Sequence, residues 1–500
     1  MASTADKIVL IMTDTQGANQ VGCYGRPELR TPCIDRLAGE GIRFDRAYTT
    51  QPVCSPARSG IFTGTYPHTN GVWGNDMPLG ANIRTIGQRL TDNAFHCAYI
   101  GKWHLSATDY FDSGVCPPGW DPHYWYDMRC YLEEFTDEER LRSRQELHTP
   151  ENIRKYGITE ESTFGHRCAN RAIDFLSKHS NEPFFLTVSF DEPHGPCTCP
   201  PPYCDMFQDF DYVLGDNVRD TLEAKPAQQQ EWAQHVGFDR SRTTIRRAMF
   251  LGCNSFVDYE IGRVVEAVDR LAPDALLIYT SDHGDHLGAH GLMSKGAAMY
   301  DEITRIPFIV RWPKRTPENA VCPHPVSHID IVPTFLDAAG LEQPPFLEGA
   351  SILPTLLDPG KRPHEAVFIE FSRFEVDHDS QGGFQPIRCA FDGRYKLVVN
   401  LHYTDELYDL ETDPGEIVNL IESEEHAAIR DSLHDRILNW MDRTRDPFRG
   451  PVWERRSWRT DRRMGWGKGA TRPRPDDGYE RRVLLYRTGL PVEKWEYRND

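Results

Sequence analysis

The chain is short of positive charge and of long apolar segments. It has 56 Lys and Arg residues against 75 Asp and Glu residues, which gives a net charge of −19 with neutral histidines. This balance argues against general attraction to nucleic acid or to an anionic membrane surface. A transmembrane helix needs about 18 or more consecutive apolar residues, and the sequence has no such run. Any anion that the protein handles must therefore be bound by a local group of cations.

The chain also lacks the features of an export signal. Residues 1–17 read MASTADKIVLIMTDTQG, with no basic lead-in and no small-residue cleavage pattern, so we expect a buried strand there. The thirteen cysteines are an odd number and are scattered, which suits free thiols in a reducing compartment. We therefore expect a cytoplasmic protein.

One group of cysteines could bind zinc. The segment HGPCTCPPPYC places Cys197, Cys199 and Cys204 near His194. Zinc sites use such residues, but this spacing has no C-x-x-C pair and no second half. A loop stiffened by prolines is the favoured interpretation.

Five hundred residues are enough for one large domain and a smaller companion. Four continuous apolar runs are typical of strands buried on both faces; they are residues 7–12, 97–101, 183–190 and 275–280. Helix-period segments at 164–180 and 250–271 precede the third and fourth runs, and another helix should begin at Pro32 after Thr31. This alternation predicts an α/β fold over residues 1–362, with a large, mainly parallel (mixed) sheet flanked by helices.

The composition and the hydrophobic pattern of the sequence change twice towards the C-terminus. Residues 363–445 contain short strands separated by turns and then one helix, which predicts a small α+β domain with an antiparallel sheet. Residues 446–500 form a basic, Trp-rich extension; from 451 onward it has thirteen Lys and Arg against eight Asp and Glu, and four of the eleven tryptophans. No nucleic-acid-binding motif accompanies these residues, whereas Trp and Arg anchor protein interfaces. We expect the extension to wrap the body or a neighbouring subunit, which favours a homo-oligomer.

Polar residues of a reactive kind follow each of the four predicted strands: Asp14; Lys102 and His104; His194; and Asp282 with His283. In open α/β sheets ligands bind at the carboxyl ends of the strands. These residues are therefore expected to share one cleft.

Cys54 stands in the segment QPVCSPARSG, where Pro56 suits the first turn of a helix and Arg58 follows one turn on. A thiolate nucleophile with His104 as its base is one available chemistry. It leaves the acidic residues unexplained. Asp14, Asp282 and His283 make a ligand set suited to Ca²⁺, Mg²⁺ or Mn²⁺.

A cation beside Cys54 would be ringed by side chains that favour a tetrahedral oxyanion, namely Arg58, Lys102, His104, His194 and Lys295.

The segment CSPAR, followed by SGIFTGTYPHTNGV, resembles the signature of the type I sulfatases, a branch of the alkaline phosphatase superfamily. The likeness continues in TPCIDRLAGEGIRFDRAYT, YIGKWHL, SDHGDHLGAHGLMSKGAAMYDEITRIPFIVRWP and ELYDLETDPGEIVNL. Together these cover most of residues 7–420 in the family's order. The MTDTQ segment and the Trp-rich tail are similar to those of cytosolic bacterial members. The resemblance implies an alkaline phosphatase/sulfatase-like fold and a sulfuric ester hydrolase that acts on a small sulfated substrate, such as a sugar sulfate.

The resemblance also implies that Cys54 is a precursor. In the family a formylglycine-generating enzyme oxidises this cysteine to Cα-formylglycine, whose hydrate supplies the nucleophile. One hydroxyl attacks sulfur to form a covalent sulfate ester, and the other loses a proton and expels sulfate.

The family's roles carry over to matching positions. Asp14, Asp282 and His283 would bind the metal with modified Cys54. Arg58 and Lys102 would polarise the hydrate, and His104 would be the base for sulfate release. His194 and Lys295 would bind sulfate oxygens, with His194 as proton donor to the leaving alcohol.

One position departs from the family pattern. Many members have two adjacent aspartates after the first strand, where this chain has Asp14-Thr15. Thr15 is then a neutral neighbour of the metal, and Ca²⁺ stays the expected ion with Mg²⁺ or Mn²⁺ as alternatives. Members without the second aspartate include hydrolases of phosphonate monoesters and phosphodiesters, which is the alternative function. An inactive scaffold is disfavoured because a scaffold needs no nucleophile with its base.

A substrate-contacting segment is expected in the small domain. FSRFEVDHDSQGGFQPIRC (371–389) offers Arg373, His378 and Arg388 as polar contacts for a hydroxyl-rich leaving group. The part HDSQGG is also typical of a plain turn.

Overall fold

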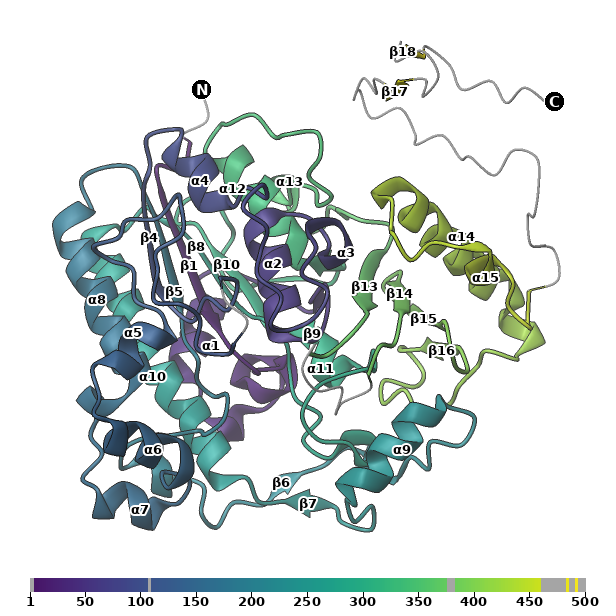
Figure 1. Ribbon diagram of the computed structural model, residues 1–500, viewed down its shortest axis with the longest axis horizontal. Coiled ribbons are helices and arrows are strands. Elements are labelled where there is room, and N and C mark those ends of the chain that lie inside the picture. The colour runs from purple at the N-terminus through teal and green to yellow at the C-terminus, as the bar shows by residue number, and fades with distance from the viewer. Residues whose placement is uncertain (1–3, 107–108, 376–382, 460–482, 485–490, 493–500) are drawn as a thin grey trace.

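The computed structural model describes residues 4–106, 109–375, 383–459, 483–484 and 491–492 (Figure 1). Its centre is a seven-stranded sheet with the order β11-β2-β10-β8-β1-β5-β4. The strands are β1 (Lys7–Thr13), β2 (Ile42–Phe44), β4 (His96–Gly101), β5 (Phe184–Ser189), β8 (Leu276–Ser281), β10 (Phe308–Arg311) and β11 (Ala320–Cys322). Only β10 runs antiparallel to its neighbours, β8 and β2. The predicted large, mainly parallel sheet is confirmed.

The four strands predicted from continuous apolar runs lie next to one another as β8-β1-β5-β4. β1 pairs in parallel with both β5 and β8, and β4 pairs in parallel with β5. Because these strands run in the same direction, their carboxyl ends lie at one edge of the sheet.

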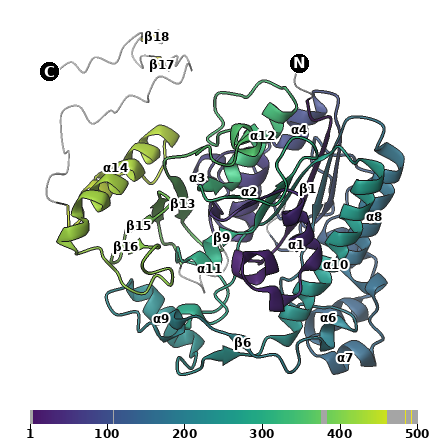
Figure 2. The same ribbon diagram turned by 180° about the vertical axis from the view of Figure 1, so that it is seen from behind.

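Helices cover both faces of this sheet (Figures 1 and 2). On one face, Val9 and Ile11 of β1 pack with α1 (Pro32–Gly39), α8 (Phe164–His179) and α10 (Ala248–Leu271). On the other face, Leu10 and Met12 pack with α2 (Cys54–Thr63), α4 (Ile86–Thr91) and α12 (Ile331–Ala338). Alternate residues of a strand point to opposite faces, so double-sided burial explains why residues 8–12 of β1 are all apolar.

The start of α1 differs in one detail from the prediction. Thr31 stands at the N-cap position, but its side chain makes no capping bond. Its hydroxyl instead accepts the backbone N–H of Gly22 at 2.8 Å, so Thr31 ties the helix start to the preceding loop.

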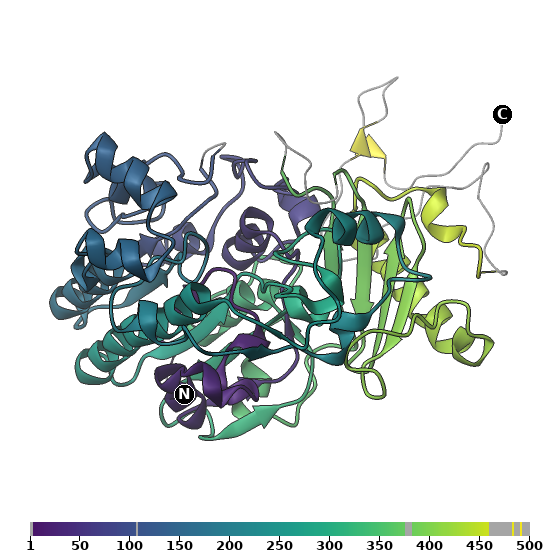
Figure 3. The same cartoon turned by 90° about the horizontal axis from the view of Figure 1, so that it is seen from below.

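A second, four-stranded antiparallel sheet follows in the chain, with the order β13-β14-β15-β16. Its strands are β13 (Val367–Phe371), β14 (Ile387–Phe391), β15 (Tyr395–Asn400) and β16 (Glu406–Asp409). One face packs on α14 (Ala427–Thr444), and the other packs on Tyr48, Val53 and Met299 of the large domain. Figure 3 shows this sheet and α14 at one end of the molecule, with α8 at the other.

A helical insertion connects β4 to α8 and lies beside the carboxyl edge of the sheet. It contains α5 (Met128–Glu133), α6 (Asp137–Gln145) and α7 (Pro150–Lys155). The side chains of Asp127, Thr136 and Thr149 cap these three helices, because each accepts a hydrogen bond from a backbone N–H in the first turn. Side-chain caps let short, polar helices start at defined residues.

The remaining helices are α3 (Pro67–Asn70), α9 (Ala227–Val236), α11 (Asp301–Thr304), α13 (Leu353–Leu357) and α15 (Pro451–Glu454). The remaining strands are β3 (Ala47–Tyr48), β6 (Tyr212–Val213), β7 (Thr244–Ile245), β9 (Arg305–Ile306), β12 (Val326–Ser327), β17 (Val483–Leu484) and β18 (Pro491–Val492). Within the described residues, no helix is both long and apolar enough to span a bilayer.

The segment with three clustered cysteines is a loop. Cys199 and Cys204 are buried in an apolar cluster with Cys253 and Phe256. Neither belongs to any of the groups of potential metal ligands found among the described residues. All thirteen cysteines of the chain carry free thiols.

The first part of the C-terminal extension packs on the small domain. Trp453 and Trp458 are buried in the cluster that contains Trp440 of α14. Arg456 forms a salt bridge with Asp405, at 2.7 Å between Nε and Oδ2. Residues 451–459 of the extension therefore pack on the small domain.

Candidate active site

The site lies at the carboxyl edge of the central sheet, where α2 begins. Cys54 is the first residue of α2, is 1% exposed, and follows the N-cap residue Val53. The side chain of Asn75 accepts the backbone N–H of Ser55 at 3.0 Å, which satisfies one free donor of the first turn. The sequence placed Cys54 at a helix start, and the structure has it there.

Four potential metal ligands meet at this point. The ligand atoms of Asp14, Cys54, Asp282 and His283 all lie within 4.8 Å of one another, and all four residues are buried. The Cys54 sulfur lies 3.2 Å from His283 Nε2 and 3.8 Å from Asp14 Oδ1. His283 Nδ1 donates to the Gly284 carbonyl at 3.0 Å, so the lone pair of Nε2 faces the cluster. Two carboxylates and an imidazole with a free lone pair fit a divalent cation.

Thr15 takes a supporting position beside these ligands. Its hydroxyl donates to Asp14 Oδ1 at 2.6 Å, and its backbone N–H donates to Asp282 Oδ1 at 3.1 Å. Its φ of +64° is a left-handed conformation that few β-branched residues adopt. The Thr15 hydroxyl therefore holds one carboxylate in place and brings no charge of its own.

Arg58 forms salt bridges with both Asp14 and Asp282. Its guanidinium contacts Asp282 Oδ2 at 3.0 Å through Nε and Asp14 Oδ2 at 3.1 Å through Nη2. Its Nη1 donates to the Lys102 carbonyl at 2.7 Å and to the Ser189 hydroxyl at 2.9 Å. The side chain is fully buried, and its planar guanidinium makes four hydrogen bonds at once, which a lysine could not do.

Lys102 is the second fully buried cation. Its ammonium lies 2.8 Å from Asp14 Oδ2 and 2.9 Å from Asp191 Oδ1. The Tyr110 hydroxyl donates to the same oxygen of Asp191 and also contacts His194 Nδ1 at 2.9 Å. Asp191 and Tyr110 thus connect Lys102 to His194.

His104 faces the site from the loop after β4. Its ring nitrogens make no hydrogen bond within the described part of the chain, and Nε2 lies 3.8 Å from Asp76 Oδ1. The backbone N–H of His104 donates to Asp112, and its φ is +58°. A buried imidazole without a hydrogen-bond partner is available to take or give a proton.

His194 and Lys295 form a pair on the other side of Lys102. Lys295 Nζ lies 3.2 Å from His194 Nε2, so the ammonium donates to the imidazole. Burial and the cations Lys102 and Lys295 lower the pKa of His194 to about 3. His194 is therefore neutral near pH 7, and its Nε2 accepts a hydrogen bond from Lys295.

The charges of the site shift the pKa of its acids and of the thiol. Burial and the neighbouring Asp14 carboxylate raise the pKa of Asp282 to about 7. For Asp14, burial acts upward, but Lys102, His194 and Arg58 outweigh it and hold its pKa well below the ordinary value. Burial and Asp14 also raise the pKa of Cys54, whereas Lys295 and Lys102 lower it, and the net shift is downward.

Of the residues predicted to contact substrate from the small domain, Arg388 is engaged elsewhere, and the prediction for Arg373 and His378 stays untested. Arg388 is fully buried, and its guanidinium pairs with Asp446 at 2.5 and 3.0 Å, so it is a structural cation of the small sheet and not an exposed contact. The Arg373 carbonyl accepts from Gln51, and its guanidinium lies 5.8 Å from the Phe384 ring centre. His378 lies outside the described residues.

Three residues of the site were missed by sequence reasoning. Asp191 stands in DEPH at the end of a predicted strand, so its position was a usable signal. Ser189 is an ordinary strand residue, and Tyr110 lies in a loop with no motif. Only the fold brings their hydroxyls to Arg58 and His194.

Family models match most of the chain. The sulfatase model matches residues 6–341, and the model described as N-sulphoglucosamine sulphohydrolase, C-terminal, matches residues 288–443. The chain is 47% identical over 492 residues to an uncharacterized sulfatase, YidJ, of Escherichia coli K12, with 97% of each protein covered. It is 26% identical over 502 residues to an N-acetylglucosamine-6-O-sulfatase of Bacteroides thetaiotaomicron, with 85% of this chain and 84% of the relative covered.

Solved structures share the fold. A protein in complex with its substrate D-glucosamine-2-N,6-O-disulfate has a TM-score of 0.73 and 22% identity, covering 89% of this chain and 99% of that one. The phosphonate monoester hydrolase of Agrobacterium radiobacter has a TM-score of 0.70 and 22% identity, covering 88% of this chain and 96% of that one. The extent of the family match and the 47% identity to YidJ show that this chain belongs to the sulfatase family and is an enzyme of that class.

Proposed function

We propose that this enzyme hydrolyses a sulfate monoester to an alcohol and sulfate, with position 54 as the nucleophile after oxidation of Cys54 to formylglycine. The observation that carries the proposal is the placement of Cys54 at the start of α2, 3.2 Å from His283 Nε2 and inside a cluster of buried acids. The hydrate of a formylglycine supplies a hydroxyl nucleophile that a thiol does not.

Asp14, Asp282 and His283, with residue 54, would hold one divalent cation. Such a cation, Ca²⁺ for preference and Mg²⁺ or Mn²⁺ as alternatives, polarises oxygen atoms and stabilises developing negative charge. Thr15 supports Asp14 and Asp282 through hydrogen bonds.

The cations of the site bind and orient the sulfate group. Lys102 is fixed between Asp14 and Asp191, and Lys295 lies beside His194. Both ammonium groups are buried and fixed before substrate arrives, so little reorganisation is needed as charge develops on the sulfate oxygens.

His104 and the His194–Lys295 pair move protons. His104 has a free ring nitrogen and is the proposed base at the step that releases sulfate. At the leaving oxygen, the proton must come from the His194–Lys295 pair. His194 is the donor expected from the sequence. Because its imidazole is neutral and accepts from Lys295, we propose in its place that Lys295 donates this proton and that His194 orients Lys295.

Peptide mass spectrometry tests the nucleophile directly. Conversion of Cys54 to formylglycine makes the peptide that spans residues 51–66 about 18 Da lighter. We expect this mass in the active enzyme, together with loss of turnover in Cys54→Ala. An unmodified thiol in fully active enzyme would overturn the proposed nucleophile.

A second candidate function is hydrolysis of phosphonate monoesters or phosphodiesters. It is favoured by Thr15, since the site has one carboxylate fewer than sites with two adjacent aspartates. Turnover of an aryl sulfate and of the matching aryl phosphonate monoester separates the two. We expect a higher kcat/KM for the sulfate, and a strong phosphonate preference would refute the first proposal.

We propose a sugar sulfate as the natural substrate class. The support is the structural neighbour bound to a glucosamine disulfate and the relative named N-acetylglucosamine-6-O-sulfatase. Maturation requires a formylglycine-generating enzyme, and the other twelve cysteines, none of them in a disulfide, support a reducing compartment such as the cytoplasm.

A further inference from the structure

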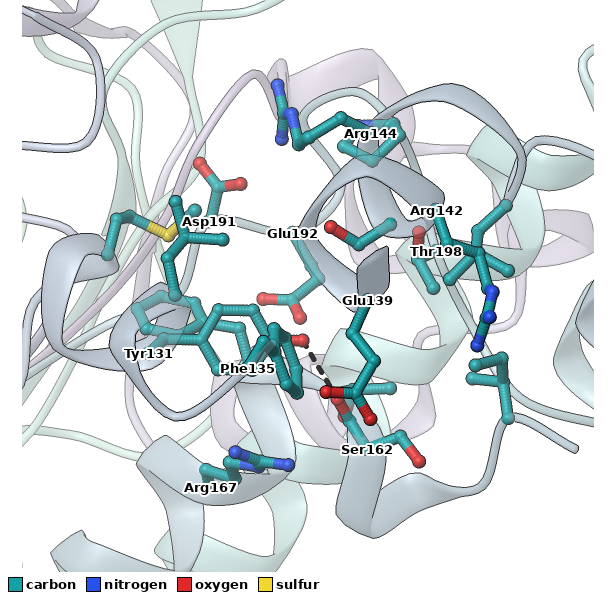
Figure 4. Close-up of a pocket in the computed structure, with 18 of the residues that line it drawn as sticks. Tyr131, Phe135, Glu139, Arg142, Arg144, Ser162, Arg167, Asp191, Glu192 and Thr198 are labelled. Carbon is teal, nitrogen blue, oxygen red and sulfur yellow. Dashed lines mark hydrogen bonds between the residues drawn. The ribbon is translucent and has the colours of Figure 1, made fainter. Parts of the chain in front are cut away.

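A cavity of about 270 Å³ lies beside the candidate active site, on the far side of Asp191 and His194 (Figure 4). Its walls come from the helical insertion, from the start of α8 and from residues 191–198. Asp191 and His194 contact the sulfate-binding cations Lys102 and Lys295 at 2.9 and 3.2 Å. The cavity therefore shares Asp191 and His194 with the candidate active site and lies next to the position proposed for the sulfate group.

The cavity walls are amphipathic. Tyr131, Phe135 and Phe164 contribute aromatic rings, and Ser143, Ser162 and Thr198 contribute polar edges. Figure 4 shows the rings of Tyr131 and Phe135 on one side of Glu192 and the Thr198 side chain on the other. Aromatic walls with a few polar groups are typical of sites for small organic ligands.

The charges of the cavity favour an uncharged ligand. Arg142, Arg144 and Arg167 line it together with Glu139, Asp191 and Glu192, so residues of both signs alternate in its walls. Arg167 pairs with Glu134 and lies 5.2 Å from the Tyr131 ring centre, while Arg142 pairs with Glu138 at 2.8 Å and lies 4.4 Å from the Tyr156 ring centre. Arg142 and Arg167 thus each lie over an aromatic ring and pair with a carboxylate, so these rings are not free to form an aromatic cage for a cation.

Glu192 is an unpartnered acid in this cavity. It is 7% exposed, and its Oε1 accepts the backbone N–H of Gly165 at 2.8 Å. Its Oε2 has no hydrogen-bond partner among the described residues. Burial and the neighbouring Asp191 carboxylate raise the pKa of Glu192 to about 8. An acid that titrates near neutral pH can donate or accept, and a hydroxyl is the ligand group that satisfies both states.

We propose that this cavity, called here the ring pocket, binds the uncharged ring of the leaving alcohol, with a second hydroxyl of that alcohol hydrogen-bonded to Glu192. The inference rests on the proposed sulfatase function and names the substrate class: monosulfate esters of compact ring alcohols that carry a further hydroxyl. Ligand pockets usually measure about 300–1,000 Å³, so a cavity of about 270 Å³ accepts one ring and not an oligosaccharide. A monosaccharide and a hydroxyaryl alcohol share this chemistry.

A matched pair of substitutions tests the ring pocket. Ser143 lines the pocket from α6, and its hydroxyl bonds back to the Arg140 carbonyl at 2.8 Å. Ser177 lies exposed on α8, with the same bond to the Asp174 carbonyl at 2.7 Å, and does not line the pocket. Ser143→Phe fills the pocket, whereas Ser177→Phe adds the same bulk elsewhere. Glu192→Met is the second variant, and it removes the polar atoms of the acid.

The probes are methyl α-D-glucopyranoside, resorcinol and cyclohexanol, with inorganic sulfate as the reference ligand. Saturation-transfer NMR on the mature, metal-loaded enzyme should show binding of the glucoside or of resorcinol, weakened about tenfold or more by Ser143→Phe and unaffected by Ser177→Phe. Glu192→Met should abolish the preference for resorcinol over cyclohexanol. Inhibition of turnover by sulfate should stay unchanged in all variants, because its cations are untouched.

The outcomes separate the two proposals. Binding of only the glucoside identifies a sugar alcohol, and binding of only resorcinol identifies an aryl alcohol. If neither compound binds, or if both serine variants bind alike, the ring pocket is refuted while sulfate inhibition still reports the sulfate site. If no sulfate ester is turned over, the proposed function fails, and ring binding measured by NMR is judged independently.

Discussion

At the scale of single residues, the geometry of the site depends on salt bridges between buried charged side chains. Arg58 and Lys102 are both fully buried and share the carboxylate of Asp14. Removing one member would leave an uncompensated charge in the interior, which is costly. The sequence motifs identify these residues, but which atoms pair is decided by β1, α2 and the loop after β4 coming together.

Thr15→Asp should tighten Ca²⁺ binding by at least about tenfold, because affinity at oxygen sites rises with the number of ligand charges. Asp tolerates the φ of +64° at this position better than a β-branched residue. Without metal the variant should be less stable than the parent, since a third carboxylate would face Asp14 and Asp282. Titration calorimetry with Ca²⁺ measures the change. Thr15→Asn, of equal shape without the charge, is the control, and equal tightening in both variants would contradict the charge argument.

His328 makes stability depend on pH. Its Nε2–H donates to the Ser281 carbonyl at 2.9 Å, and burial first, with a smaller contribution from the Arg58 charge, lowers its pKa to about 3. The unfolded chain, with an ordinary His pKa of about 6.5, binds one proton more between that pH and about 3. The free energy of unfolding should therefore fall as pH falls below 6.5, by about 1 kcal/mol per pH unit from this group.

Urea unfolding at pH 7, 6 and 5 measures this slope. His328→Gln keeps a donor for the Ser281 carbonyl but does not titrate, so its slope should be shallower by about 1 kcal/mol per pH unit. Equal slopes in the two proteins would show that protonation of His328 does not contribute to the pH dependence of the free energy of unfolding.

At the scale of secondary-structure elements, the sequence predicted the strands that are buried on both faces, because such burial requires continuous apolar runs. β1, β4, β5 and β8 are continuous apolar runs because both faces of each are covered. The three-residue strands β2 and β11 are too short to carry a pattern, and the antiparallel direction of β10 is not encoded in its own four residues. The insertion helices carry little apolar periodicity, and their start residues are fixed by side-chain caps. Their position beside His194 could therefore not be predicted from the sequence, and neither could the ring pocket that they line.

The stability of the small domain should depend strongly on the salt bridge that joins β14 to the residues just after α14. Arg388 and Asp446 are fully buried and paired through two nitrogen–oxygen contacts. Asp446→Asn should lower the free energy of unfolding by about 3–5 kcal/mol, because a buried guanidinium loses its partner. Chemical denaturation provides the measurement.

The double variant Arg388→Met/Asp446→Asn should recover part of this loss, since the unpaired guanidinium is removed, while the buried pair of Glu370 and His68 stays in place. As a control, Asp174→Asn breaks an exposed pair with Lys178 and should leave stability nearly unchanged. Equal losses in Asp446→Asn and Asp174→Asn would show that burial does not set the cost.

At the scale of the whole molecule, two sheets and one extension are joined around a single site. The small sheet packs on Val53, the residue before Cys54, so the small domain supports the start of α2. The prediction that the basic extension joins subunits falls mainly on residues after 459 that lie outside the described ranges, and it stays a prediction to be checked by light scattering. The described residues 451–459 bind the small domain.

A chain that ends at residue 459 should be more stable than one that ends at residue 450, by about 3–6 kcal/mol, because the longer chain buries Trp453 and Trp458. Trp458 also donates to Asp405 Oδ2 at 2.8 Å, and Arg456 pairs with the same carboxylate. Both truncations lack residues 460–500, so their difference in urea unfolding reports residues 451–459 alone. Trp458→Phe in the longer chain should lose only part of this stability, because it removes the hydrogen bond and keeps most of the apolar contact. Equal unfolding midpoints for the two truncations would mean that these residues lie on the small domain without stabilising it.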